Sequence, residues 1–236
     1  MQATEIDLLI HCRWIIPIVP ENQILENCSL AVDGEKIIGI YPQAEAKKRF
    51  EAVKTEALDN HVLMPGLVNA HGHSAMSLLR GYGDDLALRP WLEKHIWPAE
   101  ARHVSEEFVG DGTRLAMAEM IASGTTCFAD MYFFDEAIAE AVRDAGMRCQ
   151  IGFTVLDFPT AYGKGADDYI HKGLRLNDKY SGHSLINIAC APHAPYSVSD
   201  SAMQIISTYA NELDLPIHIH CHETAGEVSE SIDQYG

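Results

Sequence analysis

The sequence has little positive charge and no long apolar run. Its 236 residues hold 34 Asp and Glu against 17 Lys and Arg, which gives a formal net charge of −17. A surface of that sign repels polyanions, which argues against binding along a nucleic-acid backbone. No stretch of 18 consecutive apolar residues occurs, so we expect no transmembrane helix and no membrane partner. A small substrate that is uncharged or zwitterionic would not be repelled by this negative charge.

Three further signals are missing. The first seven residues, MQATEID, carry two acids and no basic residue, so they do not form a secretory signal. The six cysteines include no C-x-x-C pair, and we interpret them as reduced thiols of a cytoplasmic protein. No glycine-rich phosphate-binding loop is present, which agrees with a substrate that carries no phosphate.

Residues 1 to about 60 are predicted to form short strands and turns. Apolar runs over 6–10 and 14–19 have the length of strands. Pro17 lies inside the second run and places it at an edge or an end of a sheet, since proline cannot donate to a ladder.

A β-hairpin is predicted next. The dipeptide Asp33-Gly34 separates the apolar runs 29–32 and 36–40, a pattern typical of two strands joined by a tight turn. The polar segment 44–56 is predicted to be helix or loop.

From about residue 61 the pattern changes to strands that alternate with helices. The apolar segments of strand length are 62–70, 125–129, 148–155, 185–191 and 216–220. Helices are predicted over 106–123, 135–145 and 199–213. Near-continuous apolar strands that alternate with helices indicate an α/β protein with a parallel sheet covered on both faces.

Five such units predict a (β/α)8 barrel of the TIM type that is present only to about its fifth strand. An open barrel leaves apolar edges and faces uncovered, so we expect the chain to be the first part of a longer protein. The predicted domains are therefore 1–60 and 61–236, the second of them a truncated barrel. The alternative is an open doubly wound sheet that is complete in itself.

Two histidines follow the first of these strands, in the sequence PGLVNAHGH over 65–73. His71 and His73 are at positions i and i+2, and alternate residues of a strand point to the same face. The C-terminal ends of barrel strands open into the active-site mouth. The pair can therefore hold one metal ion, whereas two surface histidines are the alternative interpretation.

A second histidine group ends the fifth strand, in HIHCHE over 218–223. His220 lies nearer the C-terminal end of the strand than His218, and a neutral imidazole is a good ligand for Zn²⁺ or Fe²⁺. Glu223 follows just past the strand, where its carboxylate can reach a substrate beside the metal. We interpret His218 as a deeper, hydrogen-bonded histidine of the barrel.

Two other polar residues are expected at the same mouth. His193 stands between two prolines after the fourth strand, and its restricted backbone suits a contact with substrate. A solvent histidine in a rigid turn is the alternative. Asp130 follows the second strand and is also expected at the mouth. A helix-capping or structural role is the alternative for this residue.

The H-x-H after the first strand and the H-x-x-E after the fifth together resemble the amidohydrolase superfamily. Longer strings narrow the resemblance to the 5′-methylthioadenosine/S-adenosylhomocysteine deaminases and extend it over essentially the whole chain. These strings are MPGLVNAHGH (64–73), LRG (79–81), DDL (84–86), WL (91–92), HIWPAE (95–100) and SGTTCFADMY (123–132).

The resemblance implies a metal-bearing (β/α)8 barrel with a small β-sandwich built from both ends of the chain, of which residues 1–60 are the N-terminal part. It implies one divalent metal ion, Zn²⁺ with Fe²⁺ as the alternative, on His71, His73 and His220. The family's further histidine and its metal-binding aspartate would lie beyond Gly236.

The remaining site residues are also carried over from this resemblance. Glu223 matches the proton-shuttling glutamate and so touches the substrate as well. Glu100 matches the acid that binds the ribose hydroxyls, His193 matches a substrate-contacting histidine, and Trp91 matches a wall against the nucleoside. The implied partner is a small-molecule nucleoside, and assembly as a homo-oligomer is one option.

The reaction implied by the resemblance is hydrolytic deamination of the adenine ring of 5′-methylthioadenosine or S-adenosylhomocysteine, with release of ammonia. We expect this activity of a full-length enzyme and not of residues 1–236 alone. One alternative is another amidohydrolase that acts on a nitrogen heterocycle, such as a guanine deaminase or an s-triazine hydrolase. A non-catalytic metal-binding scaffold is the alternative from a different class. Glu100 favours a sugar-bearing substrate, although the fold alone does not decide.

Overall fold

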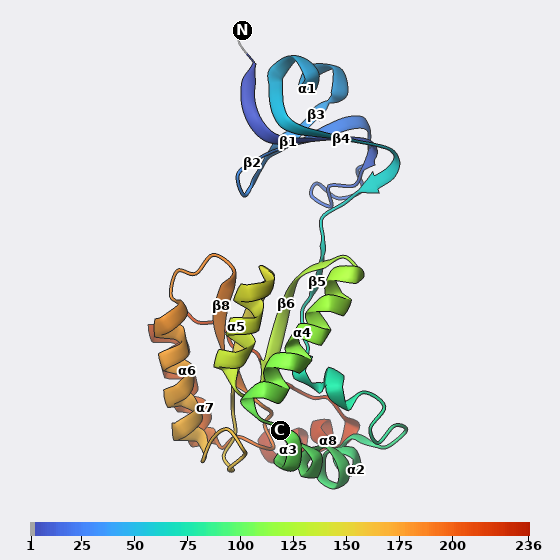
Figure 1. Cartoon of the computed structure of the whole chain (residues 1–236). Coiled ribbons are helices and arrows are strands. Elements are labelled where there is room, and N and C mark those ends of the chain that lie inside the picture. Colours follow the sequence, from blue (N-terminus) through green and yellow to red (C-terminus); the bar gives the residue numbers. More distant parts are fainter. Residues whose placement is uncertain (1–2) are drawn as a thin grey trace. The chain divides into compact units, whose positions relative to one another are not determined.

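The computed structural model describes residues 3–236 and divides the chain into two compact units, one ending at Gly66 and one beginning at Leu67 (Figure 1). The boundary predicted near residue 60 falls inside strand β4 (Phe50–Leu63), because that strand continues for three more residues. Within the described residues, no helix is both long enough and apolar enough to cross a membrane.

The first unit is a mixed four-stranded sheet in the order β3-β2-β1-β4. Its elements are β1 (Thr4–Ile15), β2 (Leu25–Asp33), β3 (Lys36–Pro42), α1 (Gln43–Arg49) and β4. Strand β1 runs parallel to β4 and antiparallel to β2. Buried Ala46 of α1 packs against Ile6 and Leu9 of β1, which gives the unit a small core of its own.

The hairpin prediction in this unit is confirmed, and two other predictions are wrong. Strands β2 and β3 pair antiparallel around Asp33 and Gly34. The runs 6–10 and 14–19 are not separate strands, because β1 continues unbroken to Ile15. The segment 44–56 is helix only as far as Arg49, after which it pairs with β1 as β4. Its polar side chains lie on an open face, so strand pairing rather than apolar content decides its structure.

The second unit contains a parallel sheet in the order β5-β6-β7-β8. Its strands are β5 (Leu67–Asn69), β6 (Thr125–Tyr132), β7 (Arg148–Val155) and β8 (Ile186–Pro192). The predicted α/β class with a parallel sheet is confirmed. The strands follow one another in chain order, so the described residues lack the reversal of strand order that defines a doubly wound sheet.

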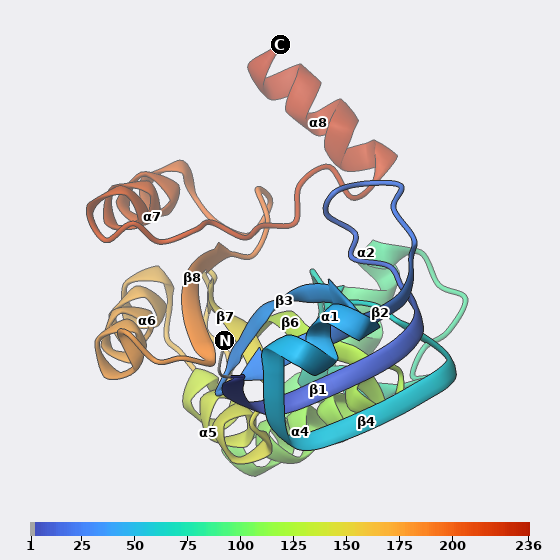
Figure 2. The same ribbon diagram turned by 90° about the horizontal axis from the view of Figure 1, so that it is seen from above.

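Helices follow the strands of this sheet. They are α4 (Glu106–Ala122), α5 (Asp135–Ala145), α6 (Ala166–Tyr180), α7 (Asp200–Glu212) and, after the last histidines, α8 (Ala225–Tyr235). Four of them, α4 to α7, follow one another around one side of the strands in Figure 2. The side chains of Ser105 and Ser199 cap the N-termini of α4 and α7, as residues of this type commonly do.

The sequence analysis did not predict α6. Gly173 interrupts its apolar pattern, and glycine is a poor helix former. A Cβ atom at this glycine would lie 2.2 Å from the ring of Phe153 on β7. The glycine is therefore needed for the helix to approach the sheet.

The fifth strand, predicted over 216–220, is only an isolated bridge between Ile217 and Cys190 of β8. The backbone N–H of His218 donates to the carbonyl of Cys190 at 2.9 Å, and no regular ladder follows. Within the described residues, this segment has a strand neighbour on one side only. Such an edge has no second ladder to keep it regular.

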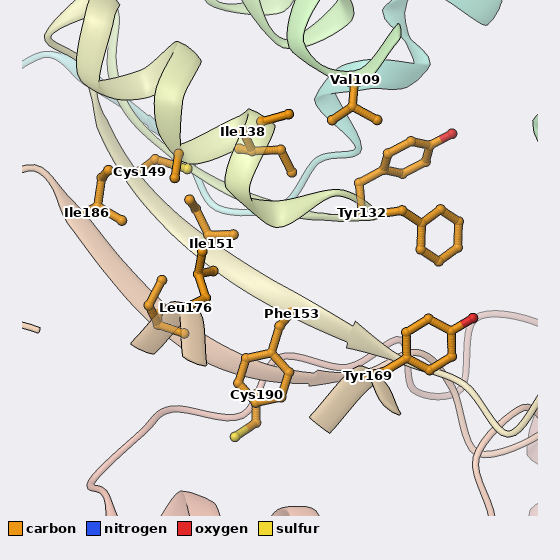
Figure 3. Close-up of a cluster of buried hydrophobic side chains, with 14 of the residues drawn as sticks. Val109, Tyr132, Ile138, Cys149, Ile151, Phe153, Tyr169, Leu176, Ile186 and Cys190 are labelled. Atoms are coloured by element: carbon orange, nitrogen blue, oxygen red, sulfur yellow. The ribbon is translucent and has the colours of Figure 1, made fainter. Parts of the chain in front are cut away.

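Large apolar side chains fill the space between the sheet and its helices (Figure 3). Ile151 and Phe153 of β7 are almost completely buried, as are Ile138 of α5 and Leu176 of α6. This close packing holds the strands, and so fixes the direction of the segments that leave their C-terminal ends.

Candidate metal centre and active site

The predicted site residues lie around one cavity of about 490 Å³ in the second unit. Those that line it are His73, Trp91, Glu100, His193, His220 and Glu223. His73 and His193 follow the C-terminal ends of β5 and β8, where a parallel sheet characteristically presents its functional groups. His71 is more exposed and lies beside two of these histidines.

Three imidazoles, two of which line this cavity, lie close together. The Nε2 atom of His220 lies 3.1 Å from Nε2 of His71 and 3.2 Å from Nε2 of His73. Each of the three residues offers one ligand atom, and these atoms all lie within 4.8 Å of one another. The structure therefore brings together the three histidines that the sequence analysis selects.

In two of these three histidines the other ring nitrogen faces a backbone carbonyl. Nδ1 of His73 is 2.6 Å from the carbonyl of Met131, and Nδ1 of His220 is 2.8 Å from the carbonyl of His193. A carbonyl oxygen only accepts, so each Nδ1 carries a proton and donates it. In the neutral ring the Nε2 atom is then a bare lone pair.

Facing lone pairs at these distances repel one another unless a cation lies between them. Burial lowers the pKa of His73 to about 4 and also lowers the pKa of His71, which keeps these rings neutral near pH 7. Histidines that bind metals typically donate their second ring N–H to a carbonyl in this way. The residues present therefore fit a divalent metal ion.

The sequence analysis expects His218 to be a hydrogen-bonded histidine deeper in the barrel, and the structure places it in contact with His71 of this group. Its Nε2 atom is 2.9 Å from Nδ1 of His71, and its own Nδ1 is buried without a hydrogen-bond partner among the described residues. The expected hydrogen bond exists, but its partner is another histidine of the site. His218 can therefore orient the His71 ring as the carbonyls orient the other two.

The segment that carries His73 is held from two sides. The fully buried carboxylate of Asp130 accepts a hydrogen bond from the backbone N–H of Ser74 at 2.7 Å. On the other side, a Cβ atom at Gly112 of α4 would lie 2.5 Å from the carbonyl oxygen of Ala75, so only glycine permits this approach. Asp130 thus supports the site by accepting from the first backbone N–H of the short 3-10 helix Ser74–Leu79, so both a capping role and a supporting role apply.

His193 is fixed in one protonation form by Ser197. The Ser197 hydroxyl donates to the carbonyl of Ala194 at 3.1 Å and lies 2.8 Å from Nδ1 of His193. Its single proton is used, so His193 Nδ1–H donates to the hydroxyl oxygen. Burial lowers the pKa of His193 to about 4, which leaves Nε2 as a neutral hydrogen-bond acceptor.

A carboxylate and a tyrosine meet on another wall of the cavity. Glu100 lies on the short helix α3 (Trp97–His103), and the hydroxyl of Tyr132 donates to its Oε1 at 2.7 Å. Burial raises the pKa of Glu100, and this hydrogen bond opposes that effect.

Aromatic side chains form much of the rest of the wall. Trp91 ends helix α2 (Leu88–Trp91), and its Nε1–H donates to the carbonyl of Tyr82 at 3.0 Å, which fixes the indole. Trp97 and Phe158 pack against each other with ring centroids 5.8 Å apart. The cavity therefore has a polar imidazole end and a broad apolar surface suited to a flat ring.

Glu223 lies at the rim of the cavity with an exposed side chain. Its backbone N–H donates to Glu227 at 3.3 Å, and the hydroxyl of Thr224 accepts from the backbone N–H of Glu227 at 3.2 Å. Thr224 thus caps the start of α8, and Glu227 reaches back to the residue before the cap. The main chain of Glu223 is held in this way, while its carboxylate makes no hydrogen bond among the described residues.

Sequence reasoning did not identify the residues that hold the others. Tyr132 and Met131 belong to a quoted motif, but nothing in the motif shows that one holds Glu100 and the other His73. Ser197 follows His193 by four residues and was not singled out. The one signal in the sequence is that alternate residues of a strand point the same way, which places Asp130 and Tyr132 on the same side of β6.

Comparison with known proteins shows the family of the chain. Residues 62–236 match the amidohydrolase family. The chain is 54% identical over 99% of its length to a 5-methylthioadenosine/S-adenosylhomocysteine deaminase of Saccharophagus degradans, and 50% identical over 99% to one of Teredinibacter turnerae. It covers 52% and 53% of those proteins, so the chain spans about half the length of the curated relatives it matches.

Solved structures show the same likeness. An adenosine deaminase from Xanthomonas campestris with bound zinc superposes with a TM-score of 0.96 at 44% sequence identity. The match covers 100% of this chain and 54% of that one. From the family match, these relatives and its α/β fold with a parallel sheet, we conclude that the chain belongs to the amidohydrolase family.

Proposed function

We propose that the full-length protein catalyses the metal-dependent hydrolytic deamination of the adenine ring of 5′-methylthioadenosine and S-adenosylhomocysteine, with release of ammonia. The observation that carries the proposal is one cavity lined by His73, His220, Glu100 and Glu223, with His71 placed so that the three imidazoles can share one ion. The named activity of relatives at 50–54% identity supports the choice of substrate.

The proposed architecture is the first part of a (β/α)8 barrel, with residues up to Gly66 as part of a β-sandwich. The consecutive strand order and the helices around one side of the sheet support the barrel. The open sheet of the first unit supports the sandwich, because it has an exposed apolar residue such as Val53 for a second layer to cover.

His71, His73 and His220 would hold one divalent ion, Zn²⁺ or alternatively Fe²⁺. Such an ion would lower the pKa of a bound water to roughly 7 and so would supply a nucleophile at neutral pH. The zinc in the adenosine deaminase from Xanthomonas campestris supports Zn²⁺ as the first choice.

Glu223 moves the proton in the proposed reaction. It accepts a proton from the attacking water and donates it to N1 of the adenine ring while the C6–O bond forms. The new C6 hydroxyl then gives up its proton to the amino group, the C6–N bond breaks, and ammonia leaves as the C6 carbonyl forms. The free carboxylate of Glu223 at the rim, beside the imidazole end, supports this role.

The other cavity residues bind and orient the nucleoside. Nε2 of His193 accepts a hydrogen bond from the substrate, Trp91 packs against its apolar part, and Glu100 accepts from the ribose hydroxyls. Those aromatic walls also exclude water from the reacting ring. We place the enzyme in the cytoplasm, a proposal that rests on the six free cysteines.

The test is ammonia release from a substrate panel by the protein made from its complete coding sequence. We expect turnover of 5′-methylthioadenosine, S-adenosylhomocysteine and adenosine, and none of guanine. Turnover of guanine alone would support the alternative heterocycle deaminase, and no turnover of any nucleoside by the zinc-loaded protein would overturn the proposal. Similarity to triazine hydrolases, at about 20% identity, shows the fold alone.

A further inference from the structure

The hydroxyl of Tyr132 contacts Glu100, one of the carboxylates that line the cavity. Its O–H donates to Oε1 of Glu100 at 2.7 Å, between residues 32 positions apart in the chain. Among the described residues, the Glu100 carboxylate makes no other hydrogen bond and no ion pair. A neutral hydroxyl therefore holds this carboxylate in place.

Tyr132 is itself rigid. It is the last residue of β6, pairs with Phe153 of β7, and is 4% exposed. Its ring packs against Phe133 with centroids 5.2 Å apart. In Figure 3 the phenolic oxygen lies at the far end of the ring, away from the aliphatic side chains.

The hydroxyl is also a permanent donor. Burial raises the pKa of Tyr132, and the neighbouring Glu100 raises it further, so the phenol stays protonated. Its proton goes to Oε1, while Oε2 of Glu100 makes no hydrogen bond among the described residues and is not sealed from the cavity. The pair therefore presents acceptor oxygens side by side.

Acceptors of this kind suit a ligand with two adjacent O–H donors. Glu100 alone has three rotatable side-chain bonds and would lose conformational entropy on binding such a ligand. The hydrogen bond to a rigid strand residue already orders the Glu100 side chain in the free protein, so less conformational entropy is lost on binding. The same strand end also holds His73 through the carbonyl of Met131, so β6 sets the spacing between Glu100 and the imidazoles.

We propose that Tyr132 is a positioning residue that holds Glu100 for a vicinal diol of the ligand and thereby sets specificity for ribonucleosides over deoxyribonucleosides. This inference rests on the proposed function, in which the diol is that of the ribose. A site built around a substrate hydroxyl rejects analogues that lack it, because its own polar groups are then left unpaired.

The first test compares Tyr132→Phe with Tyr180→Phe in the protein made from its complete coding sequence. Both tyrosines are buried, but the Tyr180 hydroxyl has no hydrogen-bond partner among the described residues, so it serves as the matched control. The readouts are kcat and KM for adenosine, 2′-deoxyadenosine and 3′-deoxyadenosine. For Tyr132→Phe we expect KM for adenosine to rise about ten-fold with kcat within about two-fold, and the deoxynucleosides to change little.

The second test asks whether Tyr132 acts through Glu100. In a Glu100→Ala background, adding Tyr132→Phe should change KM for adenosine by less than about two-fold, since the group it positions is gone. Glu100→Asp leaves β6 intact but shortens the reach by one methylene. It should reproduce the selective loss of adenosine binding even if Tyr132→Phe does not fold.

The outcomes separate this inference from the proposed function. Deamination of nucleosides by the unaltered protein together with equal losses for adenosine and its deoxy analogues in Tyr132→Phe would overturn the inference alone. The inference would also be overturned if Glu100→Asp kept the full preference for adenosine over its deoxy analogues. It would be overturned as well if Tyr132→Phe raised KM for adenosine by the same factor with and without Glu100→Ala. Failure of the unaltered protein to turn over any nucleoside would overturn the proposed function, and the inference with it.

Discussion

The carbonyl oxygen of His193 accepts two hydrogen bonds from His220, one from Nδ1–H at 2.8 Å and one from the backbone N–H at 3.1 Å. The same residue turns its own imidazole into the cavity, where Ser197 fixes it. One position after β8 therefore orients a proposed metal ligand with its main chain and lines the proposed substrate cavity with its side chain. Pro192 and Pro195 on either side of His193 restrict the backbone here, which helps to hold both its carbonyl and its imidazole in place.

Removal of a proposed ligand should abolish tight metal binding. We expect His73→Ala and His220→Ala each to lose bound zinc after dialysis against a chelator, measured by atomic emission of the purified protein. His218→Ala should weaken zinc binding by only about 10- to 100-fold, the usual scale for a residue that orients a ligand. His222→Ala, at an exposed position outside the group, is the matched control. Undiminished zinc in His220→Ala would contradict the assignment.

Glu223→Gln should separate chemistry from binding. The amide keeps the shape of the side chain but cannot carry a proton from water to the ring. We expect kcat to fall by roughly 100-fold or more, with zinc content and KM close to those of the unaltered protein. Glu230→Gln, at an exposed position of α8, is the control. An unchanged kcat would remove Glu223 from the mechanism.

Asp130 should make stability depend on pH in the acid range. Burial raises its pKa from 3.8 to about 6, because the ionised form is poorly solvated there. A carboxyl with a raised pKa in the folded state contributes stability that is fully present below the unfolded value and is lost as pH rises to about 6. The shift of about two units corresponds to roughly 3 kcal/mol of unfolding free energy.

Asp130→Asn removes this titration while its side-chain oxygen can still accept from Ser74. The stability of the variant relative to the unaltered protein should therefore increase between pH 4 and pH 7. Urea unfolding at fixed pH values measures the difference. A difference that stays constant over this range would show that Asp130 does not titrate as its burial requires.

Residues 1–236 produced alone should associate and lack deaminase activity. Strand β5 exposes apolar side chains, with Leu67 50% and Val68 67% accessible, and an unpaired strand edge invites pairing with another chain. Size-exclusion chromatography and an ammonia assay test this. A monomeric product with cooperative thermal unfolding and full activity would refute both the association and the eight-stranded barrel.

The sequence determined the alternation of strands and helices and the residue types of the site. Capping serines and apolar periodicity located α4, α5 and α7, because these signals are local. They failed for α6 and β4. The glycine of α6 is explained only by the ring of Phe153 against which it packs, and polar β4 is a strand because β1 pairs with it.

Within the site, the sequence indicated which histidines and acids share strand ends, because side-chain direction along a strand follows from parity alone. Only the tertiary structure decided which nitrogen of each imidazole is free, since that depends on carbonyls contributed by other strands, such as Met131 for His73. It also decided that Tyr132 holds Glu100 and that His218 contacts His71. These contacts join residues 32 and 147 positions apart in the chain. No local pattern encodes them, because they depend on where the packed sheet directs each strand end.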